Sequence, residues 1–322
     1  MNPLVSVLMP VYQGERFLRE AVDSVLAQTF EEFELVIIDD GSTDRSVEIA
    51  AEYERADSRV RLIRHAHVGL SRILNVGLGL CLGSWVARMD ADDVCCPDRL
   101  QAQLQFTVEH PAAVLVGTYA KYIGENGRIV GSYRLGPSTE QELREMMDRG
   151  EIVHFIHPTV MMKRALVIEA GGYDPRFGIA DDLELYNRLL AKGHLCLALP
   201  DAKLLYRVHS KSSVMSSNLR MFEQFRFVEA VLSARKRGAP EPTYAEFADS
   251  LRARPWTKRC FGKCGDIGAV FYRKAGVEIG RGRRWRGALW LGGAFALAPS
   301  YVWAKLRTQV LRKGWQRDPG AR

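Results

Sequence analysis

The chain has 322 residues, of which 47% are hydrophobic, 26% charged and 9% aromatic. This composition excludes a disordered or fibrous protein, and the length allows one large α/β domain with an appendage or two smaller domains. The net charge of +7 is uneven, because residues 252–322 hold 17 Lys and Arg against three acids, a charge of +14 that leaves −7 on the other 251 residues. An acidic body with a basic tail indicates an anionic partner, either a membrane surface or nucleic acid.

The N-terminal residues lack the basic start of a secretory signal, and they predict a strand instead. Six cysteines without a CxxC pair favour reduced thiols in a cytoplasmic protein. A metal site built on Cys260 and Cys264 is disfavoured, because no His or second Cys pair accompanies them. We therefore expect a cytoplasmic protein.

The first half of the chain alternates apolar runs with helical patterns, which predicts a mostly parallel sheet flanked by helices. The run Leu35 to Ile38 has no polar alternation, as expected of a central strand buried on both faces. Apolar residues between Phe17 and Leu26 recur at helical spacing. Other strands are expected at residues 5–9, 60–63, 85–89 and 113–117, and other helices near 47–51, 70–81, 139–149 and 183–192.

Strand signals stop near residue 216, and the remainder predicts helices over 219–237 and 244–252, followed by a Gly- and Arg-rich stretch. We therefore divide the chain into an α/β domain over residues 1–215 and a basic helical region over 216–322. Residues 287–304 carry no charge over 18 positions, and basic residues flank them on both sides.

The uncharged stretch 287–304 has three interpretations. A transmembrane helix would stand at the lower limit of length and is weakened by Gly and Pro. A helix in the membrane interface fits better, because four aromatic residues favour the headgroup region and the flanking cations would meet anionic lipid: Trp285, Trp290, Tyr301 and Trp303. The third is a soluble helical cap packed on the rest of the protein. We expect residues 281–313 to contact an anionic membrane surface, and we expect no nucleic-acid partner.

Acidic residues gather where the predicted strands end. They form three groups: Asp39 and Asp40; Asp90, Asp92 and Asp93; and Asp181 and Asp182 in a later loop. In open α/β sheets, ligands bind at the carboxyl ends of the strands. The three groups therefore predict one electronegative cleft.

The segment Asp90-Ala91-Asp92-Asp93 predicts a site for a divalent metal. Magnesium and manganese favour oxygen ligands and bind through few carboxylates together with substrate phosphates. Carboxylates at positions i and i+2 can serve one diphosphate-bound ion, which stabilises a leaving group. The alternative is a solvated acidic loop, and the position directly after a buried strand favours the metal site.

The other two acidic groups suggest binding and catalysis. Asp40 at a strand end can accept the N–H of a nucleobase, and Tyr12 can pack its ring against that base. Asp39 and Asp40 also suit a capping turn, and both roles can hold together. Asp181 and Asp182 are favoured at a helix start by the helix dipole, but a carboxylate there can also act as a general base on an acceptor hydroxyl.

Two histidines stand out among the seven. His209, in the segment 206–209 (YRVH), is a candidate third metal ligand or phosphate contact. His157, in the segment 157–159 (HPT), is a candidate for lining the acceptor cleft.

In this order, the motifs resemble the family 2 inverting glycosyltransferases with the GT-A fold. The resemblance covers residues 4–215, and ten motifs in register make it specific where each one alone is weak. The motifs are VSVLMPVY at 5–12, SVLAQTF at 24–30, IDDGSTD at 38–44, LNVG at 74–77, ARMDADD at 87–93, DRL at 98–100, HPTVM at 157–161, GGYD at 171–174, DD at 181–182 and YRVH at 206–209.

The resemblance assigns a role to each matching position. It implies that Pro10, Val11, Tyr12 and Asp40 hold the nucleotide, with Asp39 beside them, that Asp90 and Ala91 face the donor, that Asp92 coordinates the metal and that Asp182 is the base with Asp181 in support. Arg99, Arg207 and His157 are candidate acceptor or phosphate contacts. The chain departs from the family at Asp181, where the family usually has Glu, and at Gln13, where it usually has Asn.

The implied reaction is an in-line displacement with inversion at the anomeric carbon, assisted by Mn²⁺ or Mg²⁺. A nucleotide-sugar donor, UDP being favoured, would glycosylate a glycan or lipid-linked acceptor, as in bacterial surface-polysaccharide assembly, at the inner face of the cell membrane. A nucleotidyltransferase is the alternative enzyme, but residues 10–15 lack its Gly-rich cationic loop. A dehydrogenase is disfavoured because no GxGxxG follows the first strand. A binding protein that acts through its basic tail would leave the clustered acids unexplained.

Overall fold

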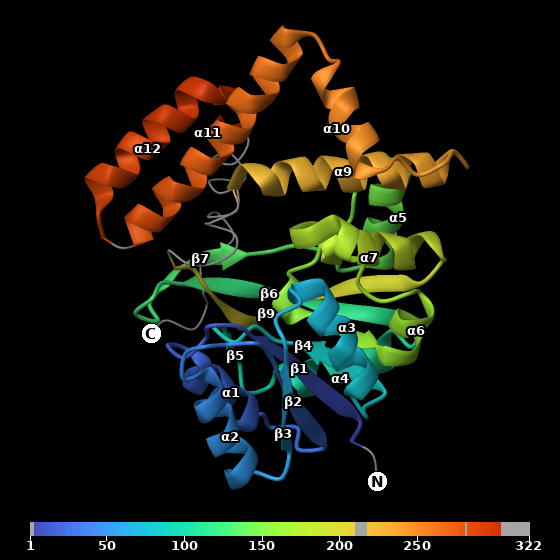
Figure 1. Ribbon diagram of the computed structural model, residues 1–322, viewed down its shortest axis with the longest axis vertical. Coiled ribbons are helices and arrows are strands. Elements are labelled where there is room, and N and C mark those ends of the chain that lie inside the picture. Colours follow the sequence, from blue (N-terminus) through green and yellow to red (C-terminus); the bar gives the residue numbers. More distant parts are fainter. Residues whose placement is uncertain (1–2, 210–217, 281, 304–322) are drawn as a thin grey trace. The chain divides into compact units, whose positions relative to one another are not determined.

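The computed structural model describes residues 3–209, 218–280 and 282–303 (Figure 1). The chain divides into two compact units, one formed by Met1–Val208 with Phe227–Pro240 and the other by His209–Arg226 with Glu241–Arg322. Helix α9 (Asn218–Lys236) contributes to both units. The expected division into a catalytic domain and a membrane-contacting region remains a prediction.

The first unit is built on a nine-stranded sheet in the order β3-β2-β1-β4-β8-β6-β9-β5, with β7 paired to β6. Strands β1 to β4 pair in parallel, as do β6 and β9, whereas β8, β5 and β7 pair antiparallel with their neighbours. The strands are β1 (Val5–Val11), β2 (Phe33–Asp40), β3 (Val60–His65), β4 (Trp85–Arg88), β5 (Val94–Cys95), β6 (Ala113–Ile123), β7 (Ile129–Tyr133), β8 (Met161–Lys163) and β9 (Leu195–Arg207). The predicted α/β class is confirmed.

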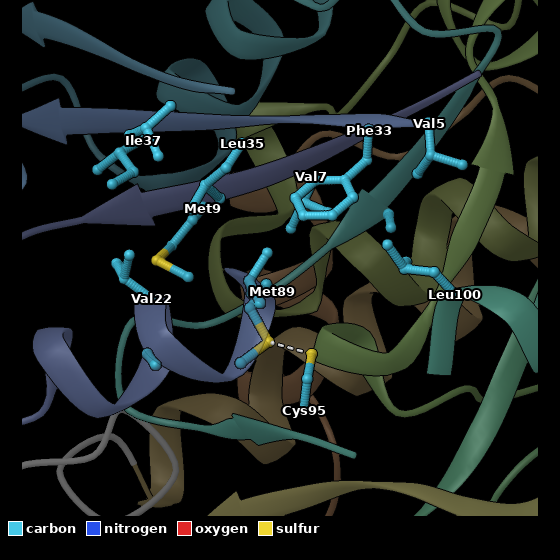
Figure 2. Close-up of a cluster of buried hydrophobic side chains, with 14 of the residues drawn as sticks. Val5, Val7, Met9, Val22, Phe33, Leu35, Ile37, Met89, Cys95 and Leu100 are labelled. Carbon is cyan, nitrogen blue, oxygen red and sulfur yellow. Dashed lines mark hydrogen bonds between the residues drawn. The ribbon is translucent and has the colours of Figure 1, made fainter. Parts of the chain in front are cut away.

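Helices cover both faces of this sheet (Figure 1). They are α1 (Leu18–Leu26), α2 (Ser46–Ala56), α3 (Leu70–Leu80), α4 (Arg99–Glu109), α5 (Glu140–Asp148), α6 (Arg164–Glu169) and α7 (Asp181–Ala191), with short 3-10 turns at His157–Thr159 and Pro175–Ala180. The alternation of side chains along each strand separates two cores. Val5, Val7 and Met9 of β1 pack with α1 and α2, and Figure 2 shows them with Val22 of α1, whereas Leu8 points to the opposite face with α3 and α7.

The second unit contains α10 (Tyr244–Arg252), α11 (Trp256–Gly280) and α12 (Arg284–Leu297). Glycines allow α11 and α12 to pack closely, since a Cβ on Gly293 would meet Phe271 and one on Gly268 would meet Ala298. The partner of the earlier α11 residue, Gly268, is the later residue, Ala298, and the partner of Phe271 is the earlier residue, Gly293. The two helices therefore form an antiparallel hairpin. Within the described residues, every helix is too short or too polar to span a bilayer.

Candidate active site

The ends of three adjacent parallel strands supply the first part of the site. Strand β1 lies between β2 and β4, with Val11 opposite Asp39 and Leu8 opposite Arg88, so the three carboxyl ends share one edge of the sheet. The loop after β1 lies against the loop after β4, because a Cβ on Gly14 would lie 3.7 Å from the Cβ of Ala91. The edge at which open α/β sheets bind ligands therefore carries two of the three predicted acidic groups.

The segment after β4 forms a compact carboxylate cluster. One oxygen from each of Asp90, Asp92 and Asp93 lies within 4.8 Å of the others. Asp93 is buried, and burial together with the charges of Asp92 and Asp90 raises its pKa well above the ordinary value. Its Oδ1 accepts the Arg207 N–H at 2.7 Å, while its Oδ2 is buried without a hydrogen-bond partner. Three mutually repelling oxygen donors with a spare buried oxygen suit a hard divalent cation.

The predicted contacts Arg207 and Arg99 lie beneath this cluster. Arg207 is buried, donates from Nε to the Asp92 carbonyl at 2.7 Å and pairs with Glu20 at 2.6 Å. Arg99 is 0% exposed and donates from Nη2 to the Arg88 carbonyl at 2.8 Å. Both side chains are held inside the protein by oxygens of the chain itself, and their contact with an acceptor or phosphate remains a prediction.

The second acidic group opens helix α7. Asp181 is buried and its Oδ1 accepts the N–H of Asp182 at 2.7 Å, while the Oδ1 of Asp182 accepts the N–H of Leu183 at 2.7 Å. The Asp182 side chain is 21% exposed. Burial, and then the charge of Asp181, raises the pKa of Asp182 to about 7, and burial raises that of Asp181 to about 6. Asp182 thus combines access with a proton affinity suited to a general base.

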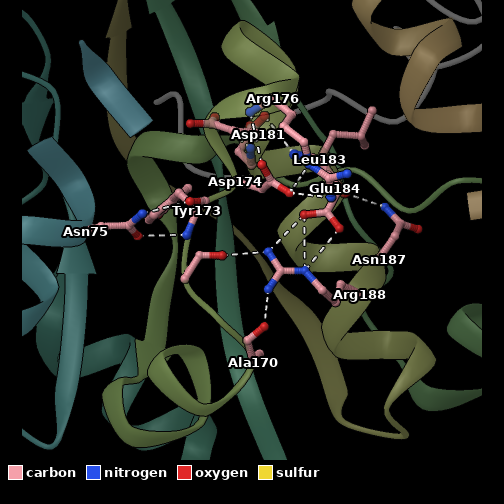
Figure 3. A network of polar contacts seen from close by, with 12 residues as sticks. Asn75, Ala170, Tyr173, Asp174, Arg176, Asp181, Leu183, Glu184, Asn187 and Arg188 are labelled. Carbon is pink, nitrogen blue, oxygen red and sulfur yellow. Dashed lines mark hydrogen bonds and ion pairs between the residues drawn. The ribbon is translucent and has the colours of Figure 1, made fainter. Parts of the chain in front are cut away.

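Polar contacts of Glu184 and Arg188 hold helix α7 in place (Figure 3). Glu184, fully buried, pairs with Arg188 at 2.8 Å and with Arg235 of α9 at 2.5 Å. Arg188 also donates to the Gly172 carbonyl at 2.5 Å, which ties α7 to the preceding loop. These contacts fix the helix whose first turn carries the candidate base.

His157 lies beside the base. Its Nδ1 is 4.0 Å from Oδ2 of Asp182, and its Nε2 is 3.0 Å from the hydroxyl of Tyr173. Burial, helped by the charge of Arg88, lowers the pKa of His157 well below its ordinary value, so the ring is neutral at pH 7. The loop carrying Tyr173 is clamped by Asn75, which exchanges two hydrogen bonds with the Tyr173 main chain at 2.7 and 2.8 Å.

Arg88 interacts electrostatically with both acidic groups, and the sequence analysis did not identify it as a site residue. Its buried guanidinium pairs with Asp90, and its Nε and Nη1 have no hydrogen-bond partner. The same positive charge opposes a rise in the pKa of Asp181 and Asp182. Burial raises the pKa of Tyr173, and the charges of Asp181, Asp182 and Asp90 add to that rise, so both acidic groups act on this hydroxyl. A cation inside the otherwise apolar segment 85–89 was the signal that could have singled out Arg88.

At the ends of β1 and β2, the predicted nucleotide residues form a tight local structure. Asp39 accepts the N–H groups of Gly41 and Ser42, both at 3.1 Å, as the capping alternative expects. Asp40 is buried and accepts the N–H groups of Val68 at 2.7 Å and Gly69 at 3.0 Å. The capping interactions therefore occupy much of both carboxylates.

Tyr12 is exposed at the end of β1, whereas Pro10 and Val11 are buried within the strand. The Tyr12 ring stacks on His67 with centroids 4.3 Å apart, and Nδ1 of His67 lies 2.9 Å from Oδ2 of Asp40. His67 therefore contacts both Tyr12, the residue predicted to pack on the nucleobase, and Asp40, the residue predicted to accept its N–H. His209 is not a member of the carboxylate cluster, and its role as a further ligand remains a prediction.

The family model for "Glycosyl transferase family 2" matches residues 6–171, more than half of the chain and both acidic loops at the strand ends. The chain belongs to glycosyl transferase family 2. This membership makes the protein a glycosyltransferase, as the order of its motifs predicts.

Named relatives agree with this membership. An uncharacterized glycosyltransferase of Haemophilus influenzae is 33% identical over 206 residues, which are 63% of this chain and 75% of that protein. The O-antigen biosynthesis glycosyltransferase WbnJ of Escherichia coli is 31% identical over 222 residues, 66% of this chain and 83% of that protein.

Solved structures share the fold of this glycosyltransferase. TarS 1-349 of S. aureus in complex with UDP-GlcNAc aligns with a TM-score of 0.60 at 19% identity, over 94% of this chain and 91% of that one. The mannosyltransferase PcManGT of Pyrobaculum calidifontis, in complex with GDP-Man and Mn²⁺, aligns with a TM-score of 0.57 at 18% identity, over 92% and 87%. The predicted GT-A fold is confirmed by this likeness.

Proposed function

We propose that this glycosyltransferase is an inverting, metal-dependent enzyme that transfers a sugar from a nucleoside diphosphate to a hydroxyl of a glycan or lipid-linked acceptor. One observation carries the proposal: the buried Arg88 pairs with Asp90 after β4, and its charge also acts on Asp181 and Asp182 at the start of α7, so one side chain is within electrostatic reach of both acidic groups. A donor with its diphosphate at one group would present its sugar to the other.

Asp182 is the proposed general base. Its carboxylate takes the proton of the acceptor hydroxyl as that oxygen attacks the anomeric carbon, while the bond from that carbon to the diphosphate oxygen breaks. Attack from the face opposite the leaving group inverts the configuration, and no covalent enzyme intermediate forms. The raised pKa of Asp182 supports this role, since a carboxylate of ordinary acidity is a poor proton acceptor at pH 7.

The carboxylate cluster is the proposed metal site, with Asp92 as ligand and Asp90 and Asp93 beside it. Mn²⁺ or Mg²⁺ bound there would offset the charge that develops on the departing diphosphate. Arg207 holds the Asp92 carbonyl and so keeps the cluster in shape. His209 is a candidate further ligand from the sequence pattern.

The donor is proposed to lie across the ends of β1 and β2, with its base at Tyr12 and Asp40. UDP is the favoured nucleotide, and the UDP-GlcNAc bound to the structurally similar TarS supports this choice. The relative WbnJ is named for O-antigen biosynthesis, which supports a role in bacterial surface-polysaccharide assembly. An acceptor of that kind suits a peripheral position at the inner face of the membrane, reached through the basic region.

The proposal is tested by thermal denaturation of the purified protein with UDP-sugars and GDP-sugars, each with and without Mn²⁺. We expect one donor to raise the melting temperature only when the ion is present. Asp92→Asn should lose the ion-dependent increase, whereas Asp182→Asn should keep it and lose transfer. If the donor raised the melting temperature equally without the ion and in Asp92→Asn, the metal role would be wrong. If Asp182→Asn transferred sugar at the full rate, the assignment of Asp182 as the base would be wrong.

A further inference from the structure

Helix α12 is apolar on two opposite faces. One face packs on α11, where a Cβ on Gly287 would meet Ile279 and one on Gly293 would meet Phe271, and where Ala294 is fully buried. This face accounts for only part of the uncharged stretch seen in the sequence. A helix that is apolar all round needs a second apolar environment.

The other face of α12 is exposed and carries no charge. Trp285 is 64% exposed and Leu289 is 68% exposed, and Phe295 is also exposed. Gly292, between Leu289 and Phe295, is also exposed, and no atom lies within 4 Å of the position that its Cβ would take. Trp285, Leu289 and Gly292 are three or four residues apart, so they share one stripe along the helix. Trp303, in the helical segment that follows Ala298, is exposed as well.

Cations outnumber acids beside this stripe, where Arg283 pairs with Glu278 at 3.8 Å. Residues 279–303 contain no Asp or Glu, and three exposed arginines, Arg283, Arg284 and Arg286, stand at the start of the helix. The Arg286 guanidinium lies 5.1 Å from the ring centroid of Trp285. An aromatic side chain beside a cation suits the boundary between lipid headgroups and acyl chains.

The start of α11 repeats the same chemistry. Trp256 and Phe261 are exposed in its first two turns. The same turns carry the cations Lys258, Arg259 and Lys263, and residues 252–265 contain no acid. Two segments of one unit therefore combine exposed aromatics with an excess of positive charge. Exposed aromatics beside cations suit contact with the surface of a bilayer.

We propose that the exposed face of α12, marked by Trp285, Leu289 and Phe295, inserts into the surface of a bilayer that contains anionic lipid. The arginines at its start then lie at the lipid phosphates, and the basic, aromatic start of α11 adds a second contact. The proposal deepens the proposed function by naming the surface at which a lipid-linked acceptor is met, but the face itself is assigned on its own chemistry. The positive charge selects an anionic bilayer over an uncharged protein partner.

The test is flotation of the full-length protein with vesicles of phosphatidylcholine alone or mixed with phosphatidylglycerol. We expect binding to the mixed vesicles that weakens as salt rises, because salt screens the arginines. Trp285→Ser combined with Leu289→Ser should weaken binding at least about tenfold, since two exposed apolar groups lose their burial in lipid. The matched control is Val108→Ser in α4, which removes an apolar side chain that is 72% exposed far along the chain from the stripe.

Replacing Arg283, Arg284 and Arg286 by Gln should weaken the preference for phosphatidylglycerol, and the cations at the start of α11 should retain part of it. Failure of the wild-type protein to float, or equal flotation of the double Ser variant, would overturn the proposal. A self-association that only the double Ser variant loses, without lipid binding, would assign the face to a second copy of the chain and also overturn it. The ion-dependent thermal response to the donor is measured on every variant, so a failed membrane assignment remains distinct from a failed enzymatic one.

Discussion

Single residues at the site show how the local environment changes the chemistry of a carboxyl group. Asp181 and Asp182 are neighbours in the chain, yet Asp181 is buried and Asp182 is partly exposed. The loss of water raises the pKa of both, to about 6 for Asp181 and about 7 for Asp182, and the charge of Asp181 adds to the rise at Asp182. The exposed member of the pair is thus the one able to accept a proton from a bound acceptor.

This pKa predicts the pH dependence of transfer. The base acts as the carboxylate, so activity should be low below pH 7 and should rise as pH increases through about 7. The measurement is kcat against pH at saturating donor and metal, with Asp181→Asn as the comparison. Removing the Asp181 charge lowers the pKa of Asp182, so the rise should move to lower pH. A rate that is independent of pH around 7 would contradict the assignment.

Gln13 adopts a backbone conformation that suits another residue. It is the one non-glycine residue with positive φ in the described chain, at 54°. Glycine and asparagine adopt this conformation more readily than glutamine does. The position matches the family's usual Asn, so the departure noted in the sequence falls where the backbone is strained.

Gln13→Asn should therefore raise stability by about 0.5 kcal/mol, measured by urea denaturation. The gain is limited because Nε2 of Gln13 donates to Thr43 at 2.8 Å, and the shorter side chain gives up that contact. Gln13→Ala is the control, since it loses the contact and keeps the strain. An Asn variant no more stable than the Ala variant would show that the backbone conformation costs little.

At the scale of elements, long apolar strands were predicted well and short or polar strands were not. The expected strands over residues 35–38 and 85–89 match β2 and β4, because their burial follows from composition alone. Strands β5, with two residues, and β8, with three, exist because neighbouring strands pair with them. The exposed β7 and the partly exposed β9 likewise lack a continuous apolar run.

Two glycines of helix α3 should respond in opposite ways to alanine. Gly77 packs against Leu8, so a methyl group there would overlap the Leu8 side chain in the core, while Gly79 faces open space. Gly77→Ala should cost about 1–3 kcal/mol by overpacking, whereas Gly79→Ala should gain up to about 1 kcal/mol from helix propensity. Urea denaturation of the two variants is the measurement. A similar effect at both positions would mean that the α3–β1 contact is looser than the structure shows.

At the scale of the whole molecule, the two units share helix α9. Its C-terminal half belongs to the first unit, where Phe227 stacks on Phe177 with centroids 5.2 Å apart and Arg235 pairs with the buried Glu184. The residues proposed for base catalysis and metal binding, His209 apart, also lie in that unit. Helices α10, α11 and α12 belong to the second unit, whose exposed aromatic and basic surface has no role in these contacts.

This division predicts the outcome of truncation. A chain that ends at Pro240 retains all contacts of the first unit and should keep the ion-dependent thermal response to the donor. A chain that ends at Val208 loses Phe227 and leaves Glu184 without Arg235, which should lower stability by about 3 kcal/mol. Melting temperatures of the two truncated proteins provide the comparison. Equal stability would show that α9 contributes nothing to the first unit.

The sequence alone determined the α/β class, the family and the placing of acids at strand ends, because apolar runs and motifs are local properties of the chain. The tertiary structure decided what the charged side chains do. It buried Arg99 and Arg207 beneath the carboxylate cluster, set Arg88 between two acidic groups some 90 residues apart in the chain, and left one face of α12 uncovered. Burial and electrostatic coupling depend on which distant segments pack together, and periodicity along the chain carries no record of that packing.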